Sequence, residues 1–485
     1  MTTAVMPHVS GDDSEQNHLL DYVYDELRKG NSLAIEAYPG FGKTRLGSRL
    51  LTIFERIVMA VRTHHEMAEV FSFIGRTRGV AYAYGKPKLC HRVNNFSYGF
   101  CRAMLLFGSC NTKITNNDVA WVAATFRRPE DIREEARKRG RCLYFAVKVL
   151  AQNAKRIVAT YDYLVSNPEL LIGREAVILD EAHTLLNYID EAVISLNKTT
   201  IETLIGSLKL NNDTKWLFYA VRSAYKRSTN IHEFVENLSL AYSNYKGPDT
   251  EAIRIIDAVL DAYSHGRYVS DGKTYYFLSN ALPRVMKFEP KLVLGAYLLP
   301  MFTNSIKNII RVPGEPRVRL AVDTDLTSRY EDRGEDTYTG YARKLSQYVR
   351  NDTGNLAVFP STDFMLEVLK RLSIVDRVVT EPVNQEVKPG YVLVDVAGGR
   401  YTEGLNIKGI GNVIVCGMPY PEPNPLLDLI AKTYNCDLYT YIAIMRTVQA
   451  IGRIRGRGTA YTIDKRFAHH LDKLPRWIDL TSSPP

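Results

Sequence analysis

Short apolar runs alternate with longer segments of mixed polar and apolar residues along most of this chain. The runs Leu33–Ile35 and Ala176–Leu179 contain no polar position, which is typical of parallel strands buried on both faces. The segment Lys43–Leu51, which follows the first run, has a composition that favours a helix. Because this alternation recurs on both sides of the middle of the chain, we predict an α/β fold with two parallel-sheet domains.

The middle of the chain has a different pattern. Segments such as "TIETLIGSLKL" and "IHEFVENLSLAYSNY" are charged and carry apolar residues at helical spacing, which predicts a helical insertion. We expect the first domain to be assembled from residues 1–80, 146–189 and 273–304, interrupted by insertions at 81–145 and 190–272, and the second domain to span 305–485.

Composition narrows the class of protein. The 485 residues are 45% hydrophobic and 24% charged, which suits roughly two to four globular domains. No run of about 20 apolar residues is present, and the N-terminal segment lacks the basic-then-apolar layout of a signal peptide. We therefore expect a cytoplasmic protein without membrane contact. The net charge of +9 permits binding to phosphate backbones but does not establish it.

The segment "NSLAIEAYPGFGKTRLGSRLL" predicts a phosphate-binding loop between a strand and a helix. Gly40 and Gly42 allow the backbone N–H groups to turn toward phosphate oxygens, and the helix N-terminus adds its dipole. Lys43 can reach the outer phosphates, and Thr44 can bind Mg²⁺. Ala37 stands where the usual pattern has its first glycine.

The segment "REAVILDEAHTLL" predicts the acidic half of an ATPase site. Asp180 and Glu181 follow the apolar run directly, at the edge of the sheet where open α/β proteins bind ligands. Asp180 can bind Mg²⁺, and Glu181 can orient and deprotonate the attacking water. Two adjacent acids alone are usually a solvated turn, but their place after a buried strand favours ATP hydrolysis.

These motifs resemble those of the XPD family of superfamily 2 DNA helicases. "IEAYPGFGKT", "RIVATYDYLVSNPEL" and the DEAH box occur in the family's order, and Gln16 stands where the family has its adenine-reading glutamine. "AVRTHHEM" is similar to motif Ia. In the second half, "GNLAVFPST", "GGRYTEGLNI" and "QAIGRIRGRG" resemble motifs IV, V and VI, and the C-terminal "DKRFAHHLDKLPRWI" is most similar to archaeal-type XPD proteins.

The resemblance implies two RecA-like domains that bind ATP between them, an inserted iron–sulfur domain at 81–145 and a short helical arch domain at 190–272. It implies that Glu181, Arg453, Gln449 and Arg455 are catalytic, with Arg453 as the finger that stabilises the transferring phosphoryl group. The residues expected to bind ATP are Gln16, Ala37, Tyr38, Pro39, Gly40, Phe41, Gly42, Lys43, Thr44 and Glu403. Those expected to bind DNA are Arg62, Thr63 and Arg92.

The chain departs from the family pattern at three places. Tyr297 occupies the motif III threonine position, Asn406 replaces the usual motif V aspartate, and the second motif VI arginine comes one residue early, at Arg455, with Arg457 as the other choice. None of these changes removes the groups expected to bind Mg²⁺ and activate water. We therefore expect ATP hydrolysis more firmly than its coupling to strand separation.

Four of the six cysteines, Cys90, Cys101, Cys110 and Cys142, lie between motif Ia and the DEAH box, where the XPD family carries a four-cysteine iron–sulfur cluster. Four thiolates suit a [4Fe–4S] cluster or zinc, and spacing alone does not decide between them. The gaps lack paired C-x₂-C knuckles, which favours the cluster over zinc; four ordinary buried cysteines are the remaining reading. Basic residues alternate with aromatic rings around them, which suits a single strand or a small aromatic core equally: Lys86, Lys88, His91, Arg92, Phe96, Tyr98, Phe100 and Arg102.

The leading functional hypothesis is an ATP- and Mg²⁺-dependent helicase that moves 5′ to 3′ on single-stranded or forked DNA in DNA repair, as the resemblance implies. We expect a monomer with repair-protein partners, associated with the nucleoid if the host is prokaryotic. The alternative is a nucleic-acid-binding assembly factor that uses ATP as a switch without unwinding.

Overall fold

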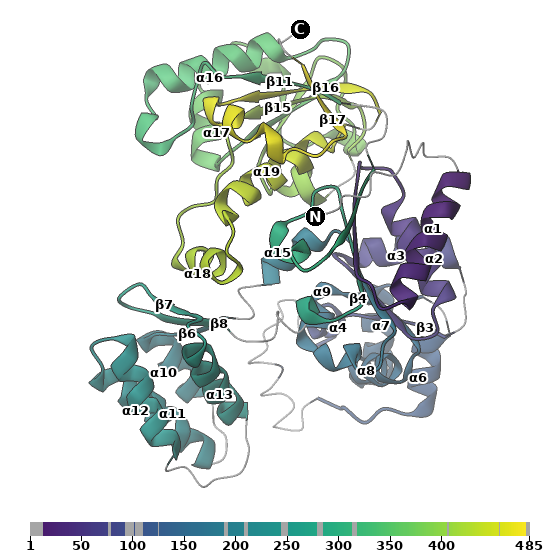
Figure 1. The fold of residues 1–485 in the computed structure, drawn as a ribbon, viewed down its shortest axis with the longest axis vertical. Helices are drawn as coiled ribbons and strands as arrows, with labels where there is room; N and C mark the ends of the chain where they lie inside the picture. Colours follow the sequence, from purple (N-terminus) through teal and green to yellow (C-terminus); the bar gives the residue numbers. More distant parts are fainter. Residues whose placement is uncertain are drawn as a thin grey trace.

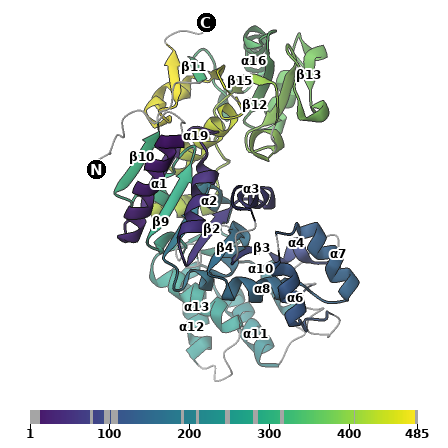
Figure 2. The ribbon, with the colours of Figure 1, turned by 90° about the vertical axis from the view of Figure 1, so that its right-hand side faces the viewer.

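The protein is built around two parallel sheets, each flanked by helices on both faces (Figure 1). The computed structural model describes residues 13–75, 79–92, 101, 110–124, 126–188, 193–207, 212–243, 251–278, 285–312, 318–404, 407–454 and 456–481. Figure 2 shows the second domain above the first, with the two insertions below. Both expected RecA-like domains are confirmed.

The first sheet has the order β10-β1-β9-β5-β2-β4-β3. Its strands are β1 (Leu33–Ala37), β2 (Ile57–Val61), β3 (Val80–Ala83), β4 (Arg156–Thr160), β5 (Ala176–Leu179), β9 (Lys291–Gly295) and β10 (Asn308–Val312). The apolar strands β1, β2 and β5 are buried at every position. The helical segments of this domain are α1 (Asp13–Arg28), α2 (Lys43–Ile53), α3 (His64–Ile74), α9 (Tyr161–Ser166), η1 (Pro168–Leu171), η2 (Ala182–Tyr188) and α15 (Pro300–Thr303).

The second sheet has the order β13-β14-β12-β15-β16-β11-β17, again all parallel. Its strands are β11 (Val318–Asp323), β12 (Gly354–Phe359), β13 (Val378–Val379), β14 (Val392–Val396), β15 (Ile410–Cys416), β16 (Gly458–Ile463) and β17 (Ile478–Thr481). Its main helical segments are α16 (Glu335–Tyr348), α17 (Thr362–Leu369), η7 (Arg400–Gly404), α18 (Pro425–Tyr434), α19 (Leu438–Ile451) and η8 (Lys465–His469).

Two insertions leave the first domain. The first contains α4 (Lys86–Leu89), α6 (Asn116–Ala123), α7 (Pro129–Arg139) and α8 (Tyr144–Asn153). The second contains β6 (Val193–Leu196), α10 (Lys198–Ser207), α11 (Asn212–Arg227), α12 (Ile231–Ser243), α13 (Glu251–Ser264), β7 (Tyr268–Ser270) and β8 (Tyr275–Leu278). This helical insertion buries its own apolar cluster, centred on Phe234 and Phe277.

Strand pairing moves three of the expected domain boundaries. β3 continues past residue 80 and pairs with β4, so the first domain extends to Ala83. β8 follows residue 272, yet it pairs antiparallel with β6 and β7, so the helical insertion extends to Leu278. β10 follows residue 304, yet it pairs with β1, so the first domain extends to Val312. The sequence shows a short apolar run at each place but not the strand with which that run pairs.

Within the part of the chain that the structure describes, no helix combines the length and apolar character needed to cross a membrane.

Candidate active site

A cleft between the two RecA-like domains brings most of the expected nucleotide-binding residues together. The cavity has a volume of about 970 Å³. From the first domain it is lined by Gln16, Pro39, Gly40, Phe41, Gly42, Lys43, Thr44, Arg62, Thr63, Asp180 and Glu181, and from the second by Gln449 and Arg453. Residues that lie up to 437 positions apart in the sequence, from Gln16 to Arg453, therefore meet at one site.

The phosphate loop links β1 to α2, as the sequence predicts. Gly42 has φ 95°, in the left-handed region, and forms the N-cap of α2, so a side chain would strain this turn. Lys43 is only 6% exposed, and its Nζ donates to the carbonyl of Ala37 at 3.0 Å. Ala37 and Tyr38 are buried behind the loop. The lysine charge thus lies at the start of α2, where the helix dipole also favours an anion.

The acidic residues follow β5 at the same edge of the sheet. The Thr44 Oγ1 donates to Asp180 Oδ2 at 2.7 Å, while Asp180 Oδ1 is buried and has no hydrogen-bond partner among the residues that the structure describes. Burial, and then the neighbouring Glu181, raise the pKa of Asp180 to about 7. A buried carboxylate oxygen that has no donor, beside a threonine hydroxyl, is what a divalent cation would satisfy, because hard cations prefer oxygen ligands.

Glu181 is held in a rare backbone conformation, with φ 48°, which costs energy for a residue other than glycine and is frequent at active sites. Its Oε1 lies 3.6 Å from Lys43 Nζ, and its Oε2 lies 3.4 Å from His183 Nδ1. Burial acts to raise the pKa of Glu181, but Lys43 and His183 outweigh it and lower the pKa. Glu181 is therefore ionised, as a group that accepts a proton from water must be.

The second domain reaches the site through the end of α19. The side-chain amide of Gln449 lies 2.5 Å from His183 Nε2, so motif VI meets the DEAH box directly. A Cβ at Gly452 would lie 2.9 Å from Pro39 Cγ, which shows how closely α19 approaches the phosphate loop. Arg453 Nε donates to the Thr402 carbonyl at 2.7 Å, and this bond ties motif VI to motif V.

The remaining expected site residues have varied placements. Gln16 Nε2 donates to the Phe41 carbonyl at 2.9 Å. Arg62 and Thr63 line the nucleotide cavity from the loop after β2, and Arg92 is exposed beyond α4. Arg455, Asn406, the side chain of Glu403, and the rings and arginine expected around the cysteines at 96, 98, 100 and 102 lie outside the described residues.

Two residues near the cleft were not expected from the sequence. Glu66 forms a capping box with Thr63 at the start of α3, and its carboxylate also accepts from the Arg62 N–H at 2.7 Å. Burial raises the pKa of Glu66. His183 is buried and links Glu181 to Gln449; burial lowers its pKa. The sequence signal for Glu66 was its place three residues after Thr63, where a capping glutamate stands, and the signal for His183 was its place in the DEAH motif.

A backbone hydrogen bond joins the segments of two of the four clustered cysteines: the Cys142 N–H donates to the carbonyl of Asn111, the residue after Cys110, at 2.8 Å. Burial, and then the Cys110 and Cys101 thiols, raise the pKa of Cys142 to about 12. Burial raises the pKa of Cys101, with Cys90 and Cys110 adding to the effect. No three His, Cys, Asp or Glu side chains among the described residues are close enough to bind one metal ion. A four-iron cluster places each thiolate on a different iron, so its ligands need not converge on one point.

An ion-pair cluster holds the segment that carries the last of these cysteines. Asp118 is 2% exposed as a side chain and pairs with Arg139 at 2.8 Å and with Arg141 at 3.0 Å. It also accepts from the Thr115 N–H at 2.7 Å. Burial acts to raise the pKa of Asp118, but Arg139 and Thr115 outweigh it and hold the pKa well below its usual range. The start of α6 is thereby fixed to the turn before Cys142.

A phosphate loop with its lysine, an acidic pair at the end of a neighbouring strand and a second parallel-sheet domain that closes over them define a two-domain ATPase of the helicase type. Comparisons with known proteins agree. The family described as Helicase C-terminal domain matches residues 345–480, and the DEAD_2 family matches residues 87–201.

A curated relative is the ATP-dependent DNA helicase XPD of Sulfolobus acidocaldarius, which is 21% identical over 538 aligned residues that cover 93% of this chain and 95% of the relative. Among solved structures, one titled XPD_Helicase has a TM-score of 0.62 at 20% identity and covers 93% of this chain and 96% of its own. The structure of S. tokodaii Xpd4 has a TM-score of 0.54 at 14% identity, covering 97% and 100%. The two family matches and the curated relative support an ATP-dependent helicase of the XPD type.

Proposed function

We propose that the protein is a 5′–3′ helicase that hydrolyses ATP to translocate on single-stranded DNA, with a role in DNA repair. The observation that carries this proposal is the contact between Gln449 and His183 across the cleft. Because motif VI meets the DEAH box there, closure of the cleft on ATP and its reopening after hydrolysis would change the distance between the two domains. A change of that kind is what moves a strand held by both domains.

The chemistry rests on the residues of the first domain. Lys43 neutralises charge on the outer phosphates, and Thr44 and Asp180 would bind Mg²⁺, which supplies positive charge to the transferring phosphoryl group. Glu181 accepts a proton from the attacking water, and the Lys43 ammonium, 3.6 Å away, holds that carboxylate ionised. Arg453 and Arg455 are proposed to stabilise the transition state from the second domain, and Glu403 is proposed to contact the nucleotide.

We also propose that Cys90, Cys101, Cys110 and Cys142 bind a [4Fe–4S] cluster. The Cys142 N–H donates to the carbonyl of Asn111, the residue after Cys110, at 2.8 Å, which supports this, because thiolates gathered in one small domain are suited to a soft-metal cluster. Arg62, Thr63 and Arg92 are proposed to bind the DNA. A monomer that acts with repair-protein partners is consistent with this reading.

A strand-displacement assay tests the function. Duplexes with a single-stranded tail at either the 5′ or the 3′ end are incubated with the protein, ATP and Mg²⁺. We expect displacement of the 5′-tailed duplex alone. Displacement of only the 3′-tailed duplex would overturn the direction. ATP hydrolysis that is stimulated by a single strand but displaces none would favour the alternative, an assembly factor in which ATP is a switch. Tyr297, which departs from the family pattern in motif III, would explain such a result.

A further inference from the structure

The turn that leads from β14 into η7 is folded around one carboxylate, that of Asp395. Its Oδ2 accepts from the N–H groups of Tyr401 at 2.7 Å and Thr402 at 3.1 Å, and its Oδ1 accepts from the Val396 N–H at 2.8 Å. Gly399 leaves the room that the carboxylate needs, because a Cβ there would lie 2.2 Å from Asp395 Oδ1. A larger residue at either position would therefore change the turn.

The carboxylate of Asp395 satisfies N–H groups at the start of η7. This segment, Arg400–Gly404, is a single π-helical turn, a form that is rare and occurs often at functional sites. The first N–H groups of a helical segment have no partner within it, so the side chain that accepts from them fixes where the turn begins. Hydrogen bonds to a carboxylate are shorter and stronger than those between neutral groups.

Thr402 connects this turn to Arg453. Thr402 is 1% exposed, and its Oγ1 donates to the Gly399 carbonyl at 3.0 Å. Its N–H donates to Asp395, while its own carbonyl accepts from Arg453 Nε at 2.7 Å. A shift of η7 would therefore move the acceptor that orients the arginine.

Arg453 reaches the ATP cleft and Asp395 does not. Arg453 lines the nucleotide cavity, whereas Asp395 is not among the described residues that line it. Asp395 also precedes the segment Gly398–Ile407 that resembles motif V, so no motif of the sequence points to it. Any effect of Asp395 on the transferring phosphoryl group must pass through the turn that it holds.

We propose that Asp395 is a positioning residue for ATP hydrolysis. By accepting from the N–H groups of η7 it keeps the Thr402 carbonyl in the place where that carbonyl directs Arg453 toward the phosphoryl group. This inference rests on the proposed function, because it takes Arg453 as the residue that stabilises the transition state. A misplacement of about 1 Å can slow a reaction about 100-fold, so a small displacement of η7 is enough.

A double-mutant cycle on ATP hydrolysis without DNA tests the inference. Asp395→Ala should lower kcat by about tenfold or more and change KM for ATP by less than about twofold, since the groups that touch the bound nucleotide remain. Because Asp395 acts through Arg453, the double variant should be no slower than Arg453→Ala alone. A residue that only stabilised the domain would give losses that add.

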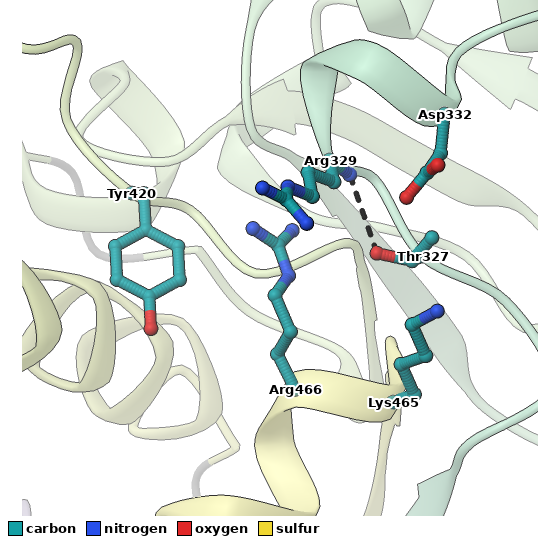
Figure 3. A pocket seen from close by; sticks show the side chains of 6 residues that line it. All are labelled: Thr327, Arg329, Asp332, Tyr420, Lys465 and Arg466. Atoms are coloured by element: carbon teal, nitrogen blue, oxygen red, sulfur yellow. Dashed lines mark hydrogen bonds between the residues drawn. The ribbon is translucent and has the colours of Figure 1, made fainter.

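Two further variants guard the result. Asp395→Asn keeps the side-chain shape and one acceptor oxygen, so it should recover part of the lost kcat, and it takes the place of the alanine variant in the cycle if that variant does not fold. Asp332→Ala is the matched control. Asp332 ends η4 (Tyr330–Asp332), which follows β11 in the same domain, and it is exposed. Figure 3 shows its carboxylate without a hydrogen bond to the residues drawn around it, so its kcat should match the wild type.

The outcomes separate this inference from the proposed function. Wild-type kcat in Asp395→Ala or in Arg453→Ala overturns the inference, even if the wild type unwinds DNA. Additive losses in the double variant, or a rise in KM alone, also overturn it. Slow, non-additive hydrolysis by the variants, with a wild type that hydrolyses ATP but displaces no strand, supports the inference and overturns the helicase.

Discussion

Trp477 Nε1 donates a hydrogen bond to the carbonyl of Ala296 at 3.1 Å. This bond joins the segment just before β17, in the second domain, to the motif III segment of the first. Trp477 is 3% exposed and Tyr297, the next residue after its acceptor, is 5% exposed. The motif III segment therefore contacts the second domain by a route separate from that of Gln449 and His183.

Tyr297 should be replaceable by phenylalanine but not by threonine. Its hydroxyl is buried without a hydrogen-bond partner among the described residues, so Tyr297→Phe should leave stability and ATP hydrolysis unchanged. Tyr297→Thr removes a buried ring and should cost about 2–4 kcal/mol. If the segment also transmits the state of the cleft, Tyr297→Thr lowers unwinding more than basal ATP hydrolysis. Equal losses of both activities would mean that the ring only packs.

Lys43→Ala should reduce ATP hydrolysis by at least about 100-fold, because the lysine supplies charge to the phosphates within a desolvated cleft. The side chain is buried and donates to the carbonyls of Ala37 and Tyr38. Circular dichroism of the variant shows whether the fold is kept. Near wild-type turnover in a folded variant would refute the nucleotide site.

Glu181→Gln should bind ATP and hydrolyse it about 10²- to 10⁴-fold more slowly, which is the usual contribution of a general base. The substitution keeps the side-chain shape and leaves Asp180 and Thr44 available to the metal. Binding is measured with a fluorescent ATP analogue and turnover by phosphate release. A variant that no longer binds the analogue would show that Glu181 holds the nucleotide and not the water.

Asp118→Asn should destabilise the small domain by about 1–3 kcal/mol, because it leaves two arginines without their buried partner. The pKa of Asp118 in the folded protein lies below its ordinary value of 3.8. The contribution of Asp118 to the free energy of unfolding is therefore complete above about pH 4, and it is lost as the pH falls through the pKa of the folded state. Proteolysis within residues 110–142 should thus be faster in the variant than in the wild type by a constant factor near neutral pH, and this difference should shrink in acid. Asp131→Asn, at an exposed pair with Arg128, is the control.

Anaerobically purified protein should be brown and contain about four irons per chain. Serine is a poor substitute for a soft thiolate, so serine should remove or destabilise the cluster when it replaces any of Cys90, Cys101, Cys110 and Cys142. Serine at Cys416, which is buried in a separate apolar cluster, or at Cys436 should not change the iron content. ATP hydrolysis should persist in part without the cluster while unwinding fails. Zinc in place of iron on metal analysis would show that the cysteines serve another purpose.

The sequence predicted the parts of the fold that depend on local pattern. The buried strands β1 and β5, and the loops that follow them, were evident because an apolar run without polar positions and a glycine-rich turn are local signals. The pairing of β10 with β1 and of β8 with β6 was missed, because pairing depends on partners far away in the chain.

The sequence predicted the individual residues of the candidate site but not the contacts between the two domains. Lys43, Thr44, Asp180 and Glu181 came from motifs, and the cavity brings them together. The bonds of Gln449 to His183 and of Trp477 to Ala296 could not be predicted, because they depend on how two separately folded sheets dock.

The helical insertion enters and leaves the first domain at one place. Val193 on β6 lies opposite Leu278 on β8 in an antiparallel pair, and the segment between them has an apolar core of its own. Residues 193–278 could therefore be exchanged for a short turn, or for a longer module, without changing the strand register of either parallel sheet. The insertion is a position at which such proteins could gain or lose length in evolution while the ATP-hydrolysing machinery stays the same.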